Sequence, residues 1–414
     1  SSTSPRPRSS STNKETPIKT CLAALVLLIA ATTLVPDDAG AIPAFARRHK
    51  LSCTTCHAPF PRLKEFGEEF AGNGFTIPES DSERDYVKTG DELLKLNKDF
   101  PVAGRFDAFA VWDDAKDIDL DLQSPWGLKL LSGGNLAPKA GYYFYFYMSE
   151  RGEVAGIEDA IIHFDDVFDS GVDVVVGQFQ TSDPLLKREL RLTFEDYLLY
   201  KAKVGGSNTD LTYDRGVMLS YGFEQTASDF VVTVTNGNGK GEADEHRQFD
   251  DNSHKNVGLR YVQGLGERLN VGFFGYAGRD NPLEFDLFGN VVDMTENDVT
   301  YWGPDVSVDL GAVAFTGQYL LRTDSDPNLS SGLMDVETKG IVAEMIYTPA
   351  GDLSKHWFTV LYNRIDSDVD DLDHESLTFG TTYMMARNLR LTMEYTRDLE
   401  HETNRVVVGT VTAF

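Results

Sequence analysis

Short segments in which apolar and polar residues alternate recur along the chain from Val102 to its last residue. Residues 389–396 alternate at every step, and Arg105 and Asp107 alternate with apolar residues such as Phe106. Successive side chains of a strand point to opposite faces, so this pattern gathers the apolar side chains on one face. Repeated segments of this kind, about ten residues long, are typical of a transmembrane β-barrel. We therefore expect an all-β fold, with the apolar face toward lipid and the charged face toward a polar lumen.

Sixteen candidate strands follow from the pattern, an even number, as in single-chain bacterial outer-membrane barrels. They cover 102–112, 125–131, 140–149, 156–165, 171–179, 212–222, 228–236, 255–264, 267–278, 299–310, 312–323, 338–349, 355–366, 375–386, 388–398 and 403–414. Links after odd strands are mostly long and links after even strands mostly short. Outer-membrane barrels have long extracellular loops and short periplasmic turns, so the alternation favours an antiparallel barrel over a soluble β-sandwich.

The first 41 residues read as a signal peptide that is removed. Lys19 precedes the apolar run 21–31, and Ala39-Gly40-Ala41 supplies a small-residue cleavage site. The apolar run is too short for a membrane-spanning helix. We therefore expect export, with integral insertion in the bacterial outer membrane and outer-membrane lipid around residues 101–414. The net charge of −27 argues against nucleic acid as a partner and permits cationic ones.

Near the predicted new N-terminus, Cys53-Thr54-Thr55-Cys56-His57 matches C-x-x-C-H, the attachment signature of a c-type haem. The two cysteines form thioethers to the haem, and the histidine becomes the proximal ligand of the iron. A thioredoxin-like redox pair has no use for the adjoining histidine. A zinc site needs a second pair of ligands, and the remaining cysteine, Cys21, lies in the signal peptide. We expect one covalently bound haem c on Cys53, Cys56 and His57.

Residues 42–100 are expected to form a small α-helical haem segment and a tether. A short helix over 62–71 would place Leu63, Phe66 and Phe70 on one face, to cover a haem edge or to pack against the barrel. We expect the segment to plug the lumen, because one haem cannot span a hydrocarbon core of about 30 Å. The longest link, 180–211, either folds inward and narrows the lumen or caps the barrel from outside.

The second axial ligand of the iron is less constrained by the sequence. By alternation, His163, Met218 and Met384 face the lumen and are candidate distal ligands, whereas Met345 and Met393 face lipid. His49 lies close before the motif, and we set it aside on steric grounds. An open or water-bound sixth position is the other alternative.

Acidic residues cluster on several long links, for example 113–121, 242–245 and 366–375. Such clusters would draw a hard cation such as Fe(II), which prefers oxygen ligands. Solvated acidic loops are the simpler interpretation.

A single C-x-x-C-H segment joined to a 16-strand barrel resembles the fused outer-membrane monohaem cytochrome–porins of iron-oxidising bacteria. The resemblance rests on the haem motif, within residues 41–78, and on flanking residues Ala41, Pro43, Phe45, Ala46, Arg47, Phe66, Gly67 and Phe70. The sequence departs from the family pattern at Arg48 and His49, where that pattern has a polar residue and then Thr or Tyr. The resemblance implies an Fe(II)-oxidising oxidoreductase with extracellular Fe(II) as donor and a periplasmic c-type cytochrome as acceptor.

Three other functions stay open at this point. The haem could serve another external donor or carry electrons outward. The chain could be a transport porin whose haem segment is only a plug. A soluble haem enzyme with an all-β domain is the third alternative.

Overall fold

The computed structural model describes residues 44–77, 87, 89–94, 100–137, 139–154, 156–182, 185–239, 243, 246–285, 291–329 and 331–414. The predicted signal peptide, 1–41, and much of the predicted tether, 76–100, lie outside these residues. Residues from Ile42 to Phe414 form one compact unit. No helix among the described residues is long and apolar enough to cross a membrane.

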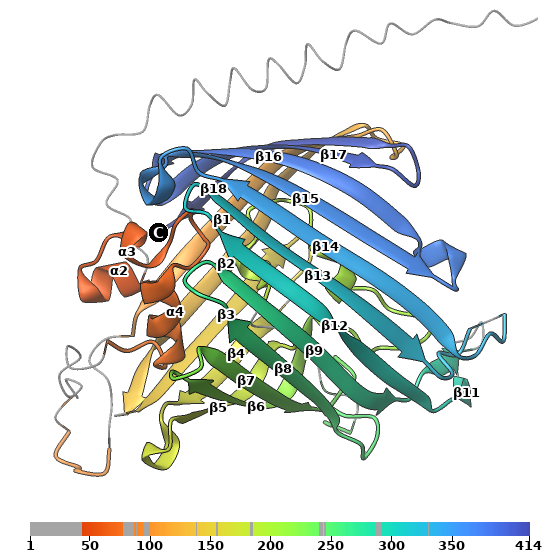
Figure 1. Cartoon of the computed structure of the whole chain (residues 1–414), viewed down its shortest axis with the longest axis horizontal. Helices are drawn as coiled ribbons and strands as arrows, with labels where there is room; N and C mark the ends of the chain where they lie inside the picture. The colour runs from red at the N-terminus through yellow and green to blue at the C-terminus, as the bar shows by residue number, and fades with distance from the viewer. Residues whose placement is uncertain are drawn as a thin grey trace, which may run out of the picture. The chain divides into compact units, whose positions relative to one another are not determined.

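Sixteen antiparallel strands form a closed barrel in which each strand pairs with its neighbours in sequence and β1 pairs with β18 (Figure 1). The barrel strands are β1 (Val102–Asp113), β2 (Leu120–Ala137), β3 (Ala140–Glu150), β4 (Gly156–Phe164), β5 (Val172–Gln180), β6 (Tyr213–Phe223), β7 (Ser228–Thr235), β8 (Asn256–Gly264), β9 (Leu269–Asp280), β12 (Asn297–Asp309), β13 (Val313–Asp324), β14 (Val336–Tyr347), β15 (His356–Ser367), β16 (His374–Ala386), β17 (Leu389–Asp398) and β18 (Asn404–Ala413). The predicted fold class and strand number are confirmed.

Two details differ from the prediction. Strand β2 runs from Leu120 to Ala137 rather than over 125–131, so the link after β1 is much shorter than predicted. Its last part contains Gly133 and Gly134, which carry no alternating side chains to reveal a strand. The predicted loop 279–298 also holds a small hairpin of β10 (Leu283–Phe285) and β11 (Val291–Met294), which is separate from the barrel.

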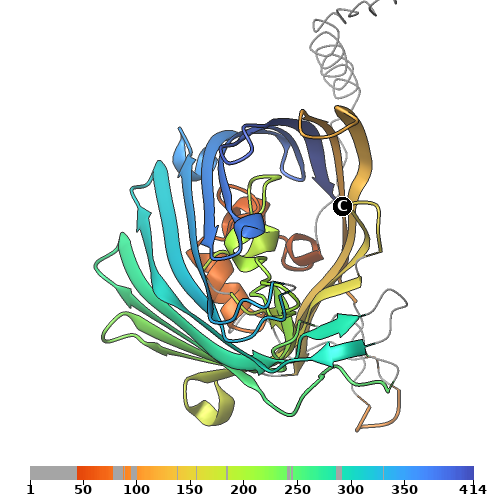
Figure 2. The same cartoon turned by 90° about the vertical axis from the view of Figure 1, so that its right-hand side faces the viewer.

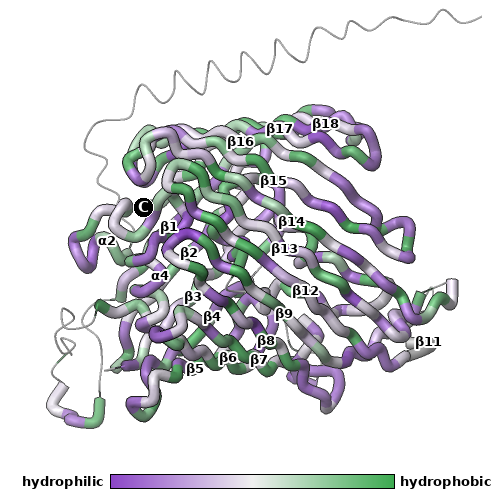
Figure 3. The backbone as a smooth tube through the Cα atoms, in the orientation of Figure 1, coloured by the Kyte–Doolittle hydropathy of each residue, from purple (hydrophilic) through white to green (hydrophobic). Residues whose placement is uncertain are grey.

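The barrel wall has an inverted polarity. Charged and polar inward side chains are buried, including Asp107, Arg260, Arg322 and Glu394, while large apolar side chains such as Met345 are exposed on the outer face. Figure 3 shows hydrophobic positions recurring along the strands. A soluble protein buries its apolar residues, so this arrangement suits a barrel surrounded by lipid.

The links divide between the two ends of the barrel. The four longest, 181–212, 236–255, 281–296 and 325–335, lie at one end, which we call the long-loop end. The opposite, short-turn end carries turns such as 310–312 and 387–388. This is the division predicted from the sequence.

The longest link, residues 181–212, folds into the barrel, and we call it the lumen loop (Figure 2). Its Leu186, Tyr197, Leu199, Tyr200 and Leu211 form one buried cluster with wall residues from β9, β12, β13, β14 and β15. Of the two alternatives for this link, the structure therefore shows the inward one.

Candidate functional site

The C-x-x-C-H motif forms a tight turn between two longer helices. Helices α2 (Ala44–His49), α3 (Cys53–Cys56) and α4 (Glu65–Gly72) follow one another. Helix α4 replaces the predicted helix over 62–71: it begins three residues later, so Leu63 lies before it, and it ends one residue later. The hydroxyl of Ser52 caps α3 by accepting from the backbone N–H of Thr54. The backbone N–H of His57 donates to the carbonyl of Cys53 at 2.9 Å, which fixes the histidine directly after the cysteine turn.

Gly67 allows α4 to pack directly on this turn. A Cβ at Gly67 would lie 2.3 Å from the carbonyl oxygen of Cys56 and 3.1 Å from a methyl of Leu63. Only a residue without a side chain permits this approach, because the obstructing atom belongs to the backbone.

We expect Gly67→Ala to disturb the cysteine turn and cost about 1–3 kcal/mol of local stability, because the new methyl group overpacks the contact. The fraction of purified protein that carries covalent haem should fall. Gly72→Ala is the matched control on the same helix, since its Cβ would meet nothing within 4 Å. Equal haem content in the two variants would contradict the assigned contact.

The imidazole of His57 is held in one orientation. Its Nδ1 lies 2.7 Å from the carbonyl oxygen of Pro61, which can only accept, so Nδ1 carries the proton and the Nε2 lone pair is left for a metal. Burial lowers the pKa of His57, which keeps the ring neutral. The ring also packs edge-on against Phe60, with centroids 4.9 Å apart. A neutral histidine with its second nitrogen fixed is the arrangement expected of an iron ligand.

A cavity of about 260 Å³ opens beside these three residues. Cys53, Cys56 and His57 line one side of it, and both cysteines are free thiols whose pKa is raised by burial. The predicted face of Leu63, Phe66 and Phe70 also lines the cavity, together with Phe45 and Phe75. On the other side lie residues of β1, β2, β3 and the lumen loop.

The lining is rich in aromatic rings that contact one another. Phe45 stacks on Phe75 with centroids 5.5 Å apart, and Phe75 stacks on Tyr143 of β3 at 4.9 Å. Phe70 meets Phe45 edge-on at 5.1 Å. The site is therefore an apolar chamber with two thiols and one fixed imidazole at its edge, which fits a haem held through thioethers.

The N-terminal segment is fastened to the short-turn end of the lumen. Two wall glycines receive it: a Cβ at Gly133 would meet Phe45, and a Cβ at Gly141 would meet the carbonyl oxygen of Gly74. Arg62 forms an ion pair with Glu344 of β14, and Lys64 pairs with Asp352 at 2.5 Å. Figures 1 and 2 show the helices at one end of the barrel, in line with its opening.

The three predicted distal ligands do not reach the cavity. Each faces the lumen side of its strand, but His163 and Met218 line other parts of the wall, and Met384 packs with Leu192, Ile346 and Trp357. Phe60 packs against this cluster, and the sulfur of Met384 accepts a hydrogen bond from Arg387. Their role as distal ligands stays a prediction that the cavity lining does not support, because alternation fixes the face of a side chain but not its height or place around the barrel.

His49, which we had set aside, lines the cavity together with His57. Its ring meets Phe70 edge-on at 5.5 Å. Among the described histidines and methionines, these two are the ones at the cavity.

The acidic links do not form a ready metal site. In the part of the chain that the structure describes, no three His, Cys, Asp or Glu side chains lie close enough together to hold a metal ion. The acidic residues Glu242, Asp244 and Glu245 lie outside the described residues.

Sequence comparisons place the chain in no family: no protein-family model matches it, and no curated protein does either. The structural comparisons are clearer. A loop-deletion mutant of OmpT from Vibrio cholerae aligns over 76% of this chain and 99% of its own, with 14% identity and a TM-score of 0.53. The fold is that of outer-membrane porins. An anion-selective porin from Comamonas acidovorans aligns over the same shares with 11% identity and a TM-score of 0.53. OmpF of Salmonella typhi, in complex with daunomycin, covers 76% of this chain and 97% of its own, with 12% identity and a TM-score of 0.51.

Proposed function

We propose that this chain is an outer-membrane electron-transfer protein that takes electrons from extracellular Fe(II) through one haem c and passes them to a periplasmic c-type cytochrome. Such a protein would belong with the fused cytochrome–porins that the sequence resembles. The observation that carries the proposal is the shared cavity: Cys53, Cys56 and His57 line one apolar chamber, and the barrel wall closes its other side.

When bound, the haem supplies a one-electron redox centre whose potential depends on its ligands and surroundings. The protein residues bind it and set those surroundings. Cys53 and Cys56 provide the thioether sulfurs, and the Pro61 carbonyl holds the His57 ring with Nε2 available. The rings of Phe45, Phe70, Phe75 and Tyr143 exclude water from the chamber.

The two ends of the barrel suit different partners. The cavity lies at the short-turn end, which faces the periplasm in outer-membrane barrels, so the redox centre is within reach of a periplasmic acceptor. The strongly negative chain draws cations such as Fe(II) toward it.

An anaerobic titration of the oxidised, detergent-purified protein with Fe(II) near neutral pH tests the proposal. We expect the absorption bands to show that the haem is reduced rapidly. This reduction should saturate as the Fe(II) concentration rises. A haem that dithionite reduces but Fe(II) does not would contradict the iron assignment and direct the search to other donors.

The second candidate is a transport barrel with a haem plug, and the porin-like fold favours it. The lumen loop and the N-terminal segment both lie inside the barrel, which argues against a wide open channel. High conductance of the purified protein in planar bilayers, together with a haem that no external donor reduces, would favour transport.

A further inference from the structure

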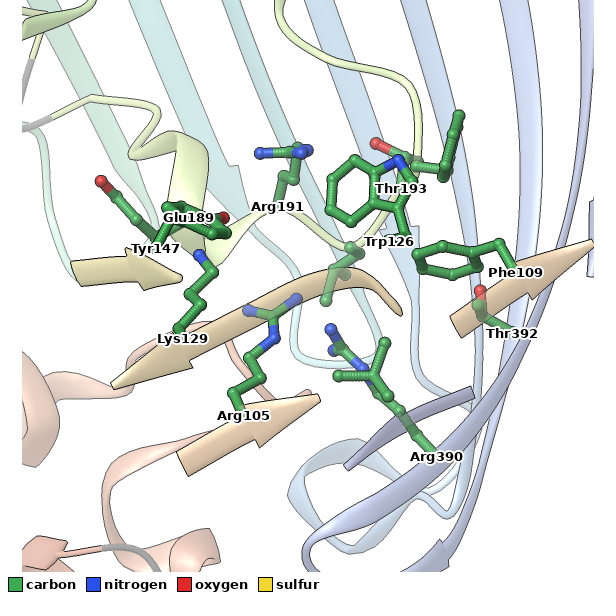
Figure 4. A pocket seen from close by; sticks show the side chains of 13 residues that line it. Arg105, Phe109, Trp126, Lys129, Tyr147, Glu189, Arg191, Thr193, Arg390 and Thr392 are labelled. Atoms are coloured by element: carbon green, nitrogen blue, oxygen red, sulfur yellow. The ribbon is translucent and has the colours of Figure 1, made fainter. Parts of the chain in front are cut away.

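Four cationic side chains converge on the lumen side of the cavity wall, and we call them the cation cluster: Arg105 of β1, Lys129 of β2, Arg390 of β17 and Arg191 of the lumen loop. All four line one small hollow, and Figure 4 shows their charged ends directed toward a common space. Arg105 and Lys129 are direct cross-strand partners. Like charges opposite each other destabilise a sheet, so this pairing needs a compensating negative charge.

The protein supplies part of that compensation, because the carboxylates of Glu158, Asp107 and Glu189 attract Lys129. Arg105 pairs with Asp107 at 2.8 Å. Lys129 and Arg390 are only 3% and 7% exposed, yet neither forms an ion pair with any described residue. Lys129 lies over the rings of Tyr145 and Tyr147, at 4.8 and 4.0 Å from their centroids.

Arg191 is attracted by Asp196, whereas Arg390 faces two cations, Arg105 and Arg191, and one carboxylate, Asp107. Arg390 donates to the carbonyl oxygen of Phe60 at 2.8 Å, and Arg191 donates to that of Arg188 at 2.9 Å. Glu189 lines the same hollow and is the carboxylate there; one of its oxygens accepts from the hydroxyls of Tyr145 and Tyr213, and its charge attracts Lys129. The hollow is therefore lined by four cations and one carboxylate. An excess of buried positive charge is unfavourable, so the cluster calls for an anionic ligand.

The position of the cluster indicates which anion it receives. Arg105 and Lys129 also line the cavity that holds Cys53, Cys56 and His57. Arg390 lies over the Phe60 ring, 5.6 Å from its centroid, and that ring contacts His57. The thiols are on the helical side of the cavity, and the cations are on the barrel side.

A haem carries two vinyl groups on one edge and two propionates on the opposite edge. Attachment of the vinyl groups to Cys53 and Cys56 therefore directs the propionates away from the thiols. We propose that Lys129 and Arg390, supported by Arg105 and Arg191, bind the two haem propionates. This inference rests on the proposed haem function. Two unpaired buried cations then meet two carboxylates, and guanidinium and ammonium groups are the usual partners of carboxylates.

The test compares stability with and without haem in the full-length chain. In the haem-loaded protein, Lys129→Met leaves a propionate without its partner and should lower the apparent unfolding temperature. In the haem-free Cys53→Ser/Cys56→Ser background, the same substitution reduces the excess of positive charge in the hollow and should raise that temperature. Arg390→Met should behave in the same way. A change of the same sign in both backgrounds would show a merely structural role and overturn the proposal.

The midpoint potential of the haem gives a second readout. A nearby cation favours the less positive, reduced haem, so Lys129→Met should lower the potential. We expect the ratio of oxidised to reduced haem at fixed potential to rise about tenfold, or about 59 mV for one electron. The potential should also become pH-dependent as the propionate takes up a proton. Lys129→Arg should restore the wild-type behaviour, and an unchanged potential in Lys129→Met would overturn the proposal.

Arg260→Met is the control for loss of a buried lumen cation, because Arg260 pairs with Asp305 and lines neither the cavity nor the hollow. It should leave the potential unchanged. Inorganic phosphate at constant ionic strength tests a free anion as the occupant: a phosphate-dependent potential in the wild-type protein would contradict propionate binding. A haem-stain and pyridine haemochrome assay separates the two proposals. Absence of haem c would overturn both, whereas attached haem with no effect of the cations would overturn this one alone.

Discussion

Replacing Cys53 and Cys56 together by serine is expected to give a folded barrel that carries no covalent haem. A serine hydroxyl does not form the thioether that fixes the macrocycle, and His57 alone leaves haem free to dissociate. The barrel itself should persist, because it closes through the β1–β18 pairing without help from the motif. Pyridine haemochrome spectra and the mobility of unheated protein in SDS gels measure the two properties separately.

Reduction by Fe(II) should disappear completely in this variant. Thr55→Ser is the matched control, since Thr55 lies in the same turn but does not line the cavity. Covalent haem in the double serine variant, or loss of haem in Thr55→Ser, would contradict the assignment of the attachment site.

The barrel was predictable because the same local pattern of alternating apolar and polar residues is repeated in its strands. Alternation along each strand, as in Arg390 to Glu394, records which side chains face the lumen, and the spacing of turn residues sets the strand ends. Where the alternation is interrupted, the strand end was predicted wrongly. The end of β2 contains Gly133 and Gly134, which have no side chain and so leave room for Phe45 and Arg48 of the N-terminal segment. This part of the strand is therefore determined by contacts between residues that are distant in sequence, and such contacts produce no alternating pattern.

The candidate site shows the same division. The motif residues Cys53, Cys56 and His57 are neighbours in sequence, so the sequence alone is enough to predict their chemistry. The cation cluster is not: Arg105 and Arg390 come from β1 and β17, which lie near each other only because the barrel closes through β18. Each is an ordinary inward-facing charge in its own strand. The same limit applies to His163, Met218 and Met384: alternation shows that they face inward, but it does not give their height or position around the barrel, and none of them lines the cavity.

The sequence left two positions open for the lumen loop, inside the barrel or as an external cap. The contacts of its apolar residues decide between them. Leu186, Tyr197 and Leu199 would be exposed on an external cap and are buried against the inner wall. Polar anchors then fix the loop. Backbone N–H groups of Phe194 and Glu195 donate to the carboxylate of Glu394 at 2.6 and 2.9 Å, and the hydroxyl of Tyr197 donates to Glu344 at 3.1 Å. Glu344 also pairs with Arg62, so the lumen loop and the N-terminal segment share one anchor.

Arg322 of β13 is the anchor whose loss should release the lumen loop. Its guanidinium donates to the carbonyl oxygens of Ala202 and Thr209 at 2.8 and 2.9 Å and to the hydroxyl of Ser207 at 2.9 Å. The same group pairs with Asp324 at 2.6 Å, where both side chains are almost fully buried. Arg322→Met therefore breaks a buried ion pair and three loop contacts at once, at a cost of about 3–5 kcal/mol.

We expect trypsin to cleave the lumen loop of Arg322→Met at least about tenfold faster than that of the wild type, because cleavage follows the population of the released loop. Lys187, Arg191, Lys201 and Lys203 are cleavage sites within it. Arg260→Met separates loop release from general destabilisation: it breaks a comparable buried pair with Asp305, and the hydrogen bonds of that pair run between its own two side chains. Equal cleavage in the two variants would mean that Arg322 stabilises the barrel wall alone. Selective cleavage in Arg322→Met would show that a single wall residue holds the loop inside the lumen. The midpoint potential of the haem in the cleaved protein would then report whether the loop also shields the cavity.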